Sequence, residues 1–84
     1  SLAGCWRLVK RGGRLLYVTC SVLEAENDQV IETAQSQLSQ CEVVPLTGQP
    51  GFKTRLGWQT LPSWDGGDGL YFSLLKKMAT DPLD

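Results

Sequence analysis

Residues 14–22, which read Arg-Leu-Leu-Tyr-Val-Thr-Cys-Ser-Val, decide the fold because the pattern changes there from strand to helix around one cysteine. The apolar run at 15–18 predicts a strand buried on both faces. Ser21 and Glu24 then fit the capping box that opens a helix. We therefore expect Cys20 at the carboxyl end of a strand, the edge where open α/β sheets bind ligands.

A helix is predicted on each side of this strand. Residues 1–10 resemble the second half of an amphipathic helix that Gly12 and Gly13 end. A second helix is predicted from about residue 24 to about residue 39, with its glutamines and Glu32 facing water. The apolar face of the first helix holds Leu2, Cys5, Trp6 and Val9, and that of the second holds Val30, Ile31, Ala34 and Leu38.

Two further strands are predicted downstream. Residues 41–46 form a short strand that Pro45 restricts to an edge or a terminus, and residues 69–77 form an apolar strand entered by a turn at Asp68 and Gly69. A long loop without a clear period, 47–67, separates them, and residues 79–84 form a tail. The order predicts an α/β fold whose three-stranded mixed sheet has the last strand between the other two.

Composition limits the function classes. The 84 residues carry a net charge of −1, so they give no global basic field for nucleic acid. Three cysteines without a Cys-x-x-Cys pair argue against a disulfide framework and a zinc site, and favour a reducing cytosol. No apolar run is long enough to span a membrane, and no signal segment opens the chain. We expect a cytoplasmic protein, monomeric, with no metal and no membrane contact.

Four separated motifs carry a family resemblance over nearly the whole chain. They are Thr19-Cys20-Ser21, then Glu26-Asn27, then Gly-Trp-Gln-Thr-Leu-Pro at 57–62, and Asp-Gly-Leu-Tyr-Phe at 68–72 with a closing Leu-Leu-Lys-Lys. In this order they resemble the C-terminal third of the RNA cytosine-5 methyltransferases. The similarity is greatest to the Sun/Fmu (RsmB-type) enzymes of small-subunit (16S) ribosomal RNA.

The resemblance implies a Rossmann-like domain that uses S-adenosylmethionine, of which this chain is the C-terminal fragment with sheet order 5-7-6. It implies that Cys20 is the nucleophile, whose thiolate adds to carbon 6 of cytosine. Carbon 5 then takes the methyl group, and loss of its proton with elimination of the thiolate releases the product. The target base must be unstacked to reach the thiol.

The cofactor-binding half of the domain lies upstream under this resemblance. The glycine-rich turn and the acidic residue that would hold S-adenosylmethionine are not among residues 1–84, and Gly12 and Gly13 do not replace them because they end a helix. We therefore assign no cofactor-binding residue in this chain. We expect the isolated chain neither to bind the cofactor well nor to turn over.

Residues near Cys20 have two interpretations. Thr19, Ser21, Glu26 and Asn27 are candidates for supporting the nucleophile loop under the resemblance. On propensity alone, Thr19 is a β-branched strand residue and Glu26 and Asn27 are ordinary helix-start residues. Cys5 and Cys41 are expected to be structural, because one lies on an apolar helix face and the other starts a strand.

Aromatic and basic side chains alternate in the long loop at Phe52, Lys53, Arg55, Trp58 and Trp64. Such residues stack on bases and hold phosphates, which makes Lys53, Arg55 and Trp58 candidate RNA contacts. In the alternative interpretation, the aromatic rings cover the sheet and the cations are solvated.

Two other function classes remain open. A non-catalytic α/β interaction module would have a buried, unreactive Cys20. A redox or thiol-transfer protein would need a second cysteine near Cys20, and none is close in the sequence.

Overall fold

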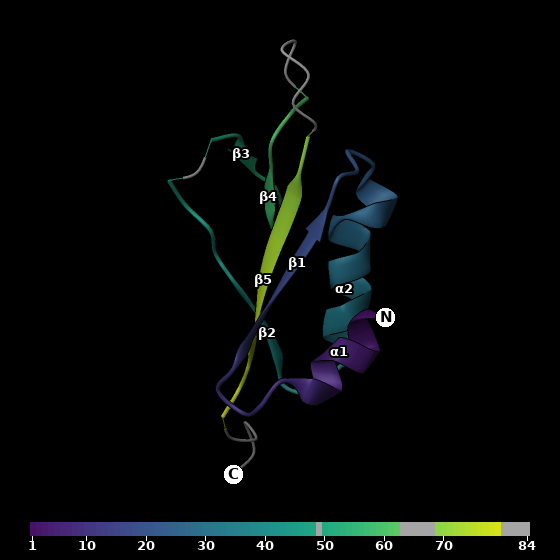
Figure 1. Ribbon diagram of the computed structural model, residues 1–84, viewed down its shortest axis with the longest axis vertical. Helices are drawn as coiled ribbons and strands as arrows, with labels where there is room; N and C mark the ends of the chain where they lie inside the picture. Colours follow the sequence, from purple (N-terminus) through teal and green to yellow (C-terminus); the bar gives the residue numbers. More distant parts are fainter. Residues whose placement is uncertain (49, 63–68, 80–84) are drawn as a thin grey trace.

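The structure is a computed structural model that describes residues 1–48, 50–62 and 69–79. Two helices and five strands make up the α/β fold (Figure 1). In chain order the elements are α1 (Leu2–Leu8), β1 (Arg14–Thr19), a 3-10 turn (Glu24–Glu26), α2 (Asp28–Gln37), β2 (Cys41–Val44), β3 (Phe52–Lys53), β4 (Trp58–Gln59) and β5 (Tyr71–Lys77). The predicted α/β class is correct.

Strand β5 is the centre of the sheet. It pairs along its length with β1, from Arg14 opposite Lys76 to Thr19 opposite Tyr71. Its other edge pairs with β2 in its C-terminal half and with β4 at its start, and β3 pairs with β4. The last strand therefore lies between the other two main strands, as expected. The three-stranded mixed sheet is wrong, because the sheet has five strands and every described pair is antiparallel.

Two separate strands share one edge of β5, and Ser73 lies between them. Strand β2 ends at Val44, directly before Pro45, which cannot donate a further ladder bond. The chain returns to the same edge at β4. Between the two pairings the fully buried Ser73 donates a hydrogen bond of 2.8 Å from its hydroxyl to the Leu56 carbonyl. Ser73 is the one residue of β5 that neither β2 nor β4 faces among the described residues, and its hydroxyl pairs with the Leu56 carbonyl there.

The core lies between the sheet and the helices. Trp6, Ile31, Tyr71 and Leu75 form its buried cluster. The predicted stripe on α2 is confirmed for Ile31 and Ala34, which are buried, and for Leu38, which packs against the core. Val30 is only half-buried, and Glu32 and the glutamines of α2 are exposed as predicted.

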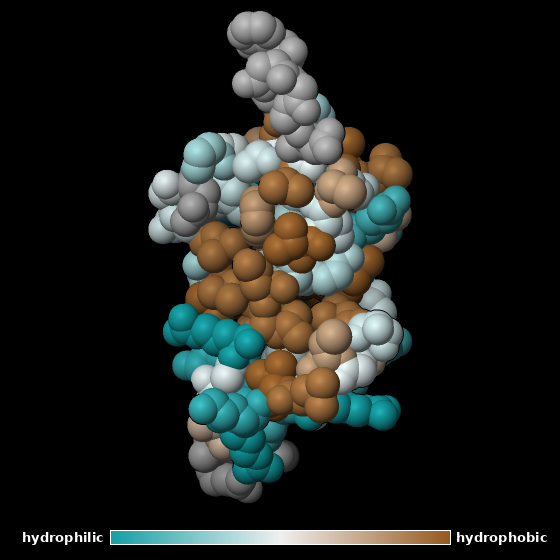
Figure 2. Space-filling model, viewed as in Figure 1, coloured by the Kyte–Doolittle hydropathy of each residue, from teal (hydrophilic) through white to brown (hydrophobic). Residues whose placement is uncertain are grey.

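Strand β1 is buried on one face only, contrary to the prediction. Leu15 and Tyr17 pack against the core, whereas Leu16 and Val18 are 54% and 46% exposed. The helices cover the first pair because alternate side chains of a strand point to opposite faces. Apolar side chains also gather across the middle of the face shown in Figure 2.

The ends of both helices differ from the predictions. Helix α1 ends at Leu8, and its Cys5 is exposed rather than packed on an apolar face, because Trp6 is the one residue that this short helix buries. The helix predicted from 24 begins with a 3-10 turn, and the non-helical Asn27 separates this turn from α2. Ser21 forms no capping box, since its hydroxyl accepts from the Leu23 amide at 3.0 Å.

The segment predicted as a loop contains the β3–β4 hairpin, which packs closely on β5. A side-chain carbon at Gly57 would meet the Phe72 carbonyl and lie 2.7 Å from the Tyr71 hydroxyl, so only glycine fits this approach. Trp64, the Asp68 half of the predicted turn and residues 80–84 of the predicted tail lie outside the described residues. Neither described helix is long and apolar enough to cross a membrane.

Candidate active site at the end of strand β1

Cys20 follows the last residue of β1, at the carboxyl end of that strand as predicted. It is a free, exposed cysteine. Thr19 pairs with Tyr71 at the start of β5, so the Cys20 end of β1 is also the end where β5 begins. In Figure 1 this end of the sheet carries β3, β4 and the connection into α2. An exposed Cys20 disagrees with the interaction-module interpretation, which expects it to be buried.

Asn27 binds the residues on both sides of Cys20. The residue is 4% exposed. Its Oδ1 accepts from the Thr19 hydroxyl at 2.6 Å, and its Nδ2 donates to the Ser21 carbonyl at 2.9 Å. The same Nδ2 donates to Gln59 Oε1 on β4 at 3.2 Å. One buried amide therefore joins the end of β1, the turn after Cys20 and the hairpin.

The Thr19 hydroxyl and Ser21 add local bonds to this turn. The Ser21 amide donates to Thr19 Oγ1 at 3.3 Å, and the Ser21 hydroxyl accepts from the Leu23 amide. Short turns of this kind occur where serine and threonine side chains bond to nearby backbone groups. The residues on both sides of Cys20 are thus hydrogen-bonded, Thr19 through its hydroxyl and Ser21 through its backbone, while the thiol is left exposed.

Glu26 enters the site through its backbone. Its carbonyl accepts from the Tyr17 hydroxyl at 2.9 Å, while the residue itself is exposed. Burial, and secondly the Glu26 charge, raise the pKa of the Tyr17 phenol. The phenol therefore stays protonated and keeps donating to the 3-10 turn at neutral pH.

Asp28 is the residue of this site that the sequence reasoning missed as a hydrogen-bond centre. Its carboxylate is buried and accepts from four donors on the hairpin and β5, namely the Thr54 hydroxyl, the Arg55 amide, the Leu56 amide and the Tyr71 hydroxyl. Burial, and secondly the bond to Asp28 and its charge, hold the pKa of Tyr71 well above its usual range. The sequence suggested only that Asp28 sits at a helix start.

The candidate RNA contacts differ in their solvent exposure and in the partners that they already bind. Lys53 is exposed on β3. Arg55 binds Glu32 through a 2.9 Å ion pair in which both side chains are more than half exposed, so it is not simply solvated. The Trp58 indole is half-buried and donates to the Pro50 carbonyl at 2.7 Å.

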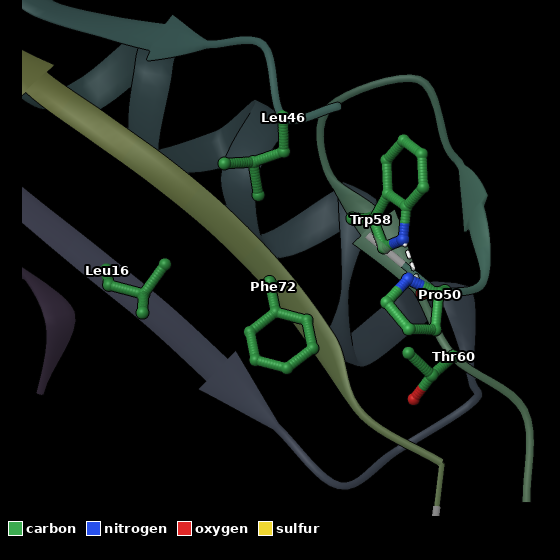
Figure 3. A pocket seen from close by; sticks show the side chains of 6 residues that line it. All are labelled: Leu16, Leu46, Pro50, Trp58, Thr60 and Phe72. Atoms are coloured by element: carbon green, nitrogen blue, oxygen red, sulfur yellow. Dashed lines mark hydrogen bonds between the residues drawn. The ribbon is translucent and has the colours of Figure 1, made fainter. Parts of the chain in front are cut away.

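Two cavities of about 360 Å³ flank the sheet at this end. One lies on the helix side beside the turn after Cys20, between Val22 and Phe52, with Asn27, Asp28 and Gln59 among its lining residues. The other is apolar and lies on the opposite face (Figure 3). There Leu16, Phe72 and the Trp58 ring line a hollow, with α2 behind the strands.

The backbone groups of Gly12 and Gly13 are already hydrogen-bonded within the fold. Gly12 and Gly13 precede β1, and their backbone groups pair with the Lys77 amide and carbonyl and the Lys10 carbonyl. No group of three metal-ligating side chains occurs in the ranges 1–48, 50–62 and 69–79. Cys41 packs against the core, and burial raises the pKa of its thiol. Its expected structural role agrees with this position.

Comparisons with known proteins identify a family and several relatives that this chain resembles. The family model described as 16S rRNA methyltransferase RsmB/F matches residues 2–76. The probable ribosomal RNA small subunit methyltransferase B of Coxiella burnetii is 45% identical over 76 residues, which cover 90% of this chain and 18% of the relative.

Two further relatives have the same name. The ribosomal RNA small subunit methyltransferase B of Xanthomonas campestris is 38% identical over 90% of this chain and 17% of its own length. That of Pasteurella multocida is 38% identical over 94% of this chain and 18% of its own length. The chain thus spans less than a fifth of the curated relatives that it matches. No solved structure matches it.

Proposed function

Because the chain belongs to the RsmB/F family of 16S rRNA methyltransferases, we propose that the protein containing it methylates carbon 5 of a cytosine in small-subunit ribosomal RNA. Cys20 is the proposed nucleophile. The observation that carries this assignment is an exposed thiol at a strand end whose neighbours, Thr19 and Ser21, are both bound by the buried Asn27. A fixed backbone with a free thiol suits a group that must meet one atom of a base.

The chemistry of cytosine requires such a group. Carbon 5 is a poor nucleophile until the thiolate sulfur bonds to carbon 6, which makes carbon 5 electron-rich. Carbon 5 then takes the methyl group of S-adenosylmethionine, which would be held by residues outside those described, and S-adenosylhomocysteine is the leaving group. After methylation, a base removes the carbon-5 proton, the bond between sulfur and carbon 6 breaks, and the ring regains its double bond. Cys20 leaves the cycle as the thiolate that entered it.

The side chains around Cys20 have supporting roles in this proposal. Asn27, Thr19 and Ser21 hold the nucleophile turn through side-chain bonds, and Glu26 supports it through its carbonyl. The burial of Asn27 also supports the proposed positioning of the turn. A buried hydrogen bond competes less with water than an exposed one does.

The hairpin supplies the proposed RNA contacts. Lys53 is an exposed cation on β3, suited to a phosphate, and Trp58 presents an indole from β4. Arg55 is the third candidate, and an RNA phosphate would have to compete there with the Glu32 carboxylate. We therefore expect Lys53 to contribute more to RNA affinity than Arg55.

The isolated 84-residue chain is proposed to be inactive. Its relatives are more than five times longer than the part that matches, and the residues described here do not supply a cofactor turn. Methylation of RNA by the purified 84-residue chain would refute this statement.

The activity is tested with the full-length protein and unmodified small-subunit ribosomal RNA. Transfer of labelled methyl from S-adenosylmethionine is measured for the wild type, Cys20→Ser and Cys5→Ser. Cys5 is also exposed, so its variant is a matched thiol control. We expect transfer by the wild type and Cys5→Ser and none by Cys20→Ser. Full transfer by Cys20→Ser would remove Cys20 from the chemistry, and no transfer by any form would favour the non-catalytic module.

A further inference from the structure

The Asp28 carboxylate is a buried hydrogen-bond centre between α2, the hairpin and β5. The residue is 7% exposed. Its Oδ1 accepts from the Thr54 hydroxyl at 2.9 Å, the Leu56 amide at 3.1 Å and the Tyr71 hydroxyl at 2.8 Å. Its Oδ2 accepts from the Arg55 amide at 3.1 Å. A carboxylate withdrawn from water needs several donors, and here they come from two other elements.

These bonds fix the turn between β3 and β4. Three of the four donors, on residues 54–56, belong to this turn. The Thr54 hydroxyl also accepts from the Gly57 amide at 3.0 Å, and the Thr54 amide donates to the Gly57 carbonyl at 2.9 Å. The turn is therefore closed on itself and held on the first residue of α2. A hairpin with two residues in each strand would be marginal in water, so its position depends on this anchor together with the pairing of β4 with β5.

The hairpin in turn reaches the Cys20 loop. β4 follows the anchored turn, and its buried Gln59 accepts from Asn27 Nδ2. Gln59 is itself held by bonds of its Nε2 to the Thr60 carbonyl at 2.8 Å and to the Leu70 carbonyl at 3.3 Å. Asn27 then contacts both neighbours of Cys20. Asp28 acts on Asn27 by two routes, as its neighbour in the chain and through the hairpin.

We propose that Asp28 is a positioning residue for the Cys20 reaction, holding the β3–β4 hairpin so that Gln59 and Asn27 keep the nucleophile turn in place. This inference rests on the proposed function. Asp28 has no role toward RNA or the methyl donor in it. Misplacement of a nucleophile by about 1 Å lowers a rate by up to about 100-fold, so loss of this anchor acts on the chemical step.

The test compares full-length wild type and Asp28→Asn for the rate of covalent adduct formation with RNA containing 5-fluorocytosine, and for kcat and KM with unmodified RNA. Asparagine keeps the volume of the side chain but turns one acceptor oxygen into a donor that faces backbone or hydroxyl donors. We expect kcat and the adduct rate to fall about 10-fold or more, with KM for RNA within about twofold of the wild type.

Ala34→Gly is the matched control for stability. Ala34 is buried on the same helix and makes none of the described hydrogen bonds to Asp28. Glycine weakens the helix, so the protein becomes less stable without loss of the anchor. We expect its adduct rate to equal that of the wild type at a temperature where both are folded.

Each outcome decides the proposal. A wild-type adduct rate in Asp28→Asn, or an equal fall in Ala34→Gly, would overturn the positioning role. If Asp28→Asn does not fold, Tyr71→Phe decides, since it removes one donor to the carboxylate and keeps the buried ring. A slower adduct then supports the role and an unchanged rate overturns it. No adduct in the wild type would instead remove the proposed function, and this inference with it.

Discussion

The Thr19 hydroxyl donates a hydrogen bond of 2.6 Å to Asn27 Oδ1, and this bond ties the last residue of β1 to the residue before α2. Cys20 and its turn lie between these two residues in the chain. Because Asn27 also donates to the Ser21 carbonyl, it binds the residues directly before and directly after the exposed thiol. The contribution of these bonds to the unfolding free energy can be measured by substituting Asn27.

Removal of the Asn27 amide is expected to destabilise the fold. In Asn27→Ala the part-buried Ser21 carbonyl and the buried Gln59 Oε1 each lose a donor, and the Thr19 hydroxyl loses its acceptor. Leaving buried polar groups without partners costs about 1–3 kcal/mol. Urea unfolding of the protein that contains this chain measures the change in unfolding free energy.

The control for this substitution is Gln35→Ala, which removes an exposed amide from α2. A surface change of this kind is expected to stay within about 0.5 kcal/mol. An equal loss in both variants would contradict a special role for the Asn27 bonds.

Stability is expected to fall in alkaline solution because of Tyr71. Burial first, and the bond to Asp28 and its charge second, raise the pKa of Tyr71 in the folded protein. Above a pH of about 10 the unfolded chain loses this proton while the folded chain keeps it. The stabilising contribution is thus complete below about pH 10 and is lost as pH rises toward the folded pKa.

Urea midpoints of wild type and Tyr71→Phe from pH 8 to pH 11 measure this effect. The wild type should lose stability above about pH 10 more steeply than Tyr71→Phe, and other tyrosines cancel in the difference. Tyr17→Phe should show a change of the same sign, since burial, and secondly Glu26, raise the pKa of Tyr17. Parallel curves for wild type and Tyr71→Phe would contradict the buried bond.

The cysteines are expected to differ in reactivity. Cys5 and Cys20 are exposed, whereas Cys41 is half-buried and burial raises the pKa of its thiol. Because the thiolate is the reactive form, Cys41 should be alkylated more slowly than the other two at pH 7.5 in the native protein. Mass spectrometry of peptides after timed exposure to iodoacetamide resolves each site. In urea the three rates should converge, and a native Cys41 as fast as Cys20 would contradict the structure.

Lys77 is expected to stabilise the end of α1. Its ammonium donates to the Trp6 and Val9 carbonyls at 3.0 Å each and lies 5.3 Å from the centre of the Trp6 ring. A cation at a helix C-terminus and over an indole contributes about 1–2 kcal/mol. Lys77→Met should therefore lower the unfolding free energy by this amount, measured with urea.

Lys76→Met is the neighbouring control on β5. None of the described carbonyls or rings is bonded to the Lys76 ammonium, so we expect a change within about 0.5 kcal/mol. A larger effect from Lys76 than from Lys77 would show that the cap at the end of α1 has no energetic role.

Much of the fold could be predicted from local sequence patterns. Ile31 and Ala34 recur at helical spacing, so their burial on α2 could be predicted, and the change of pattern after Thr19 put Cys20 at a strand end. An apolar run does not say how many of its faces will be covered, which is why Leu16 and Val18 are exposed where burial was expected.

The missed features depend on long-range contacts. β3 and β4 have two residues each, too few for a strand period. Their position depends on Asp28, whose side-chain partners Thr54 and Tyr71 lie 26 and 43 residues further along the chain. No spacing rule relates residues so far apart, so the hairpin anchor could be found only from the fold.

The assignment of Cys20 as nucleophile is tested most directly by mapping a covalent adduct. The full-length protein is incubated with S-adenosylmethionine and small-subunit ribosomal RNA containing 5-fluorocytosine, which blocks loss of the group at carbon 5, and the RNA-linked peptide is identified by mass spectrometry. We predict one adduct, on the peptide that contains Cys20, and none in Cys20→Ser. An adduct that persists in Cys20→Ser, or one mapped to another cysteine, would contradict the account.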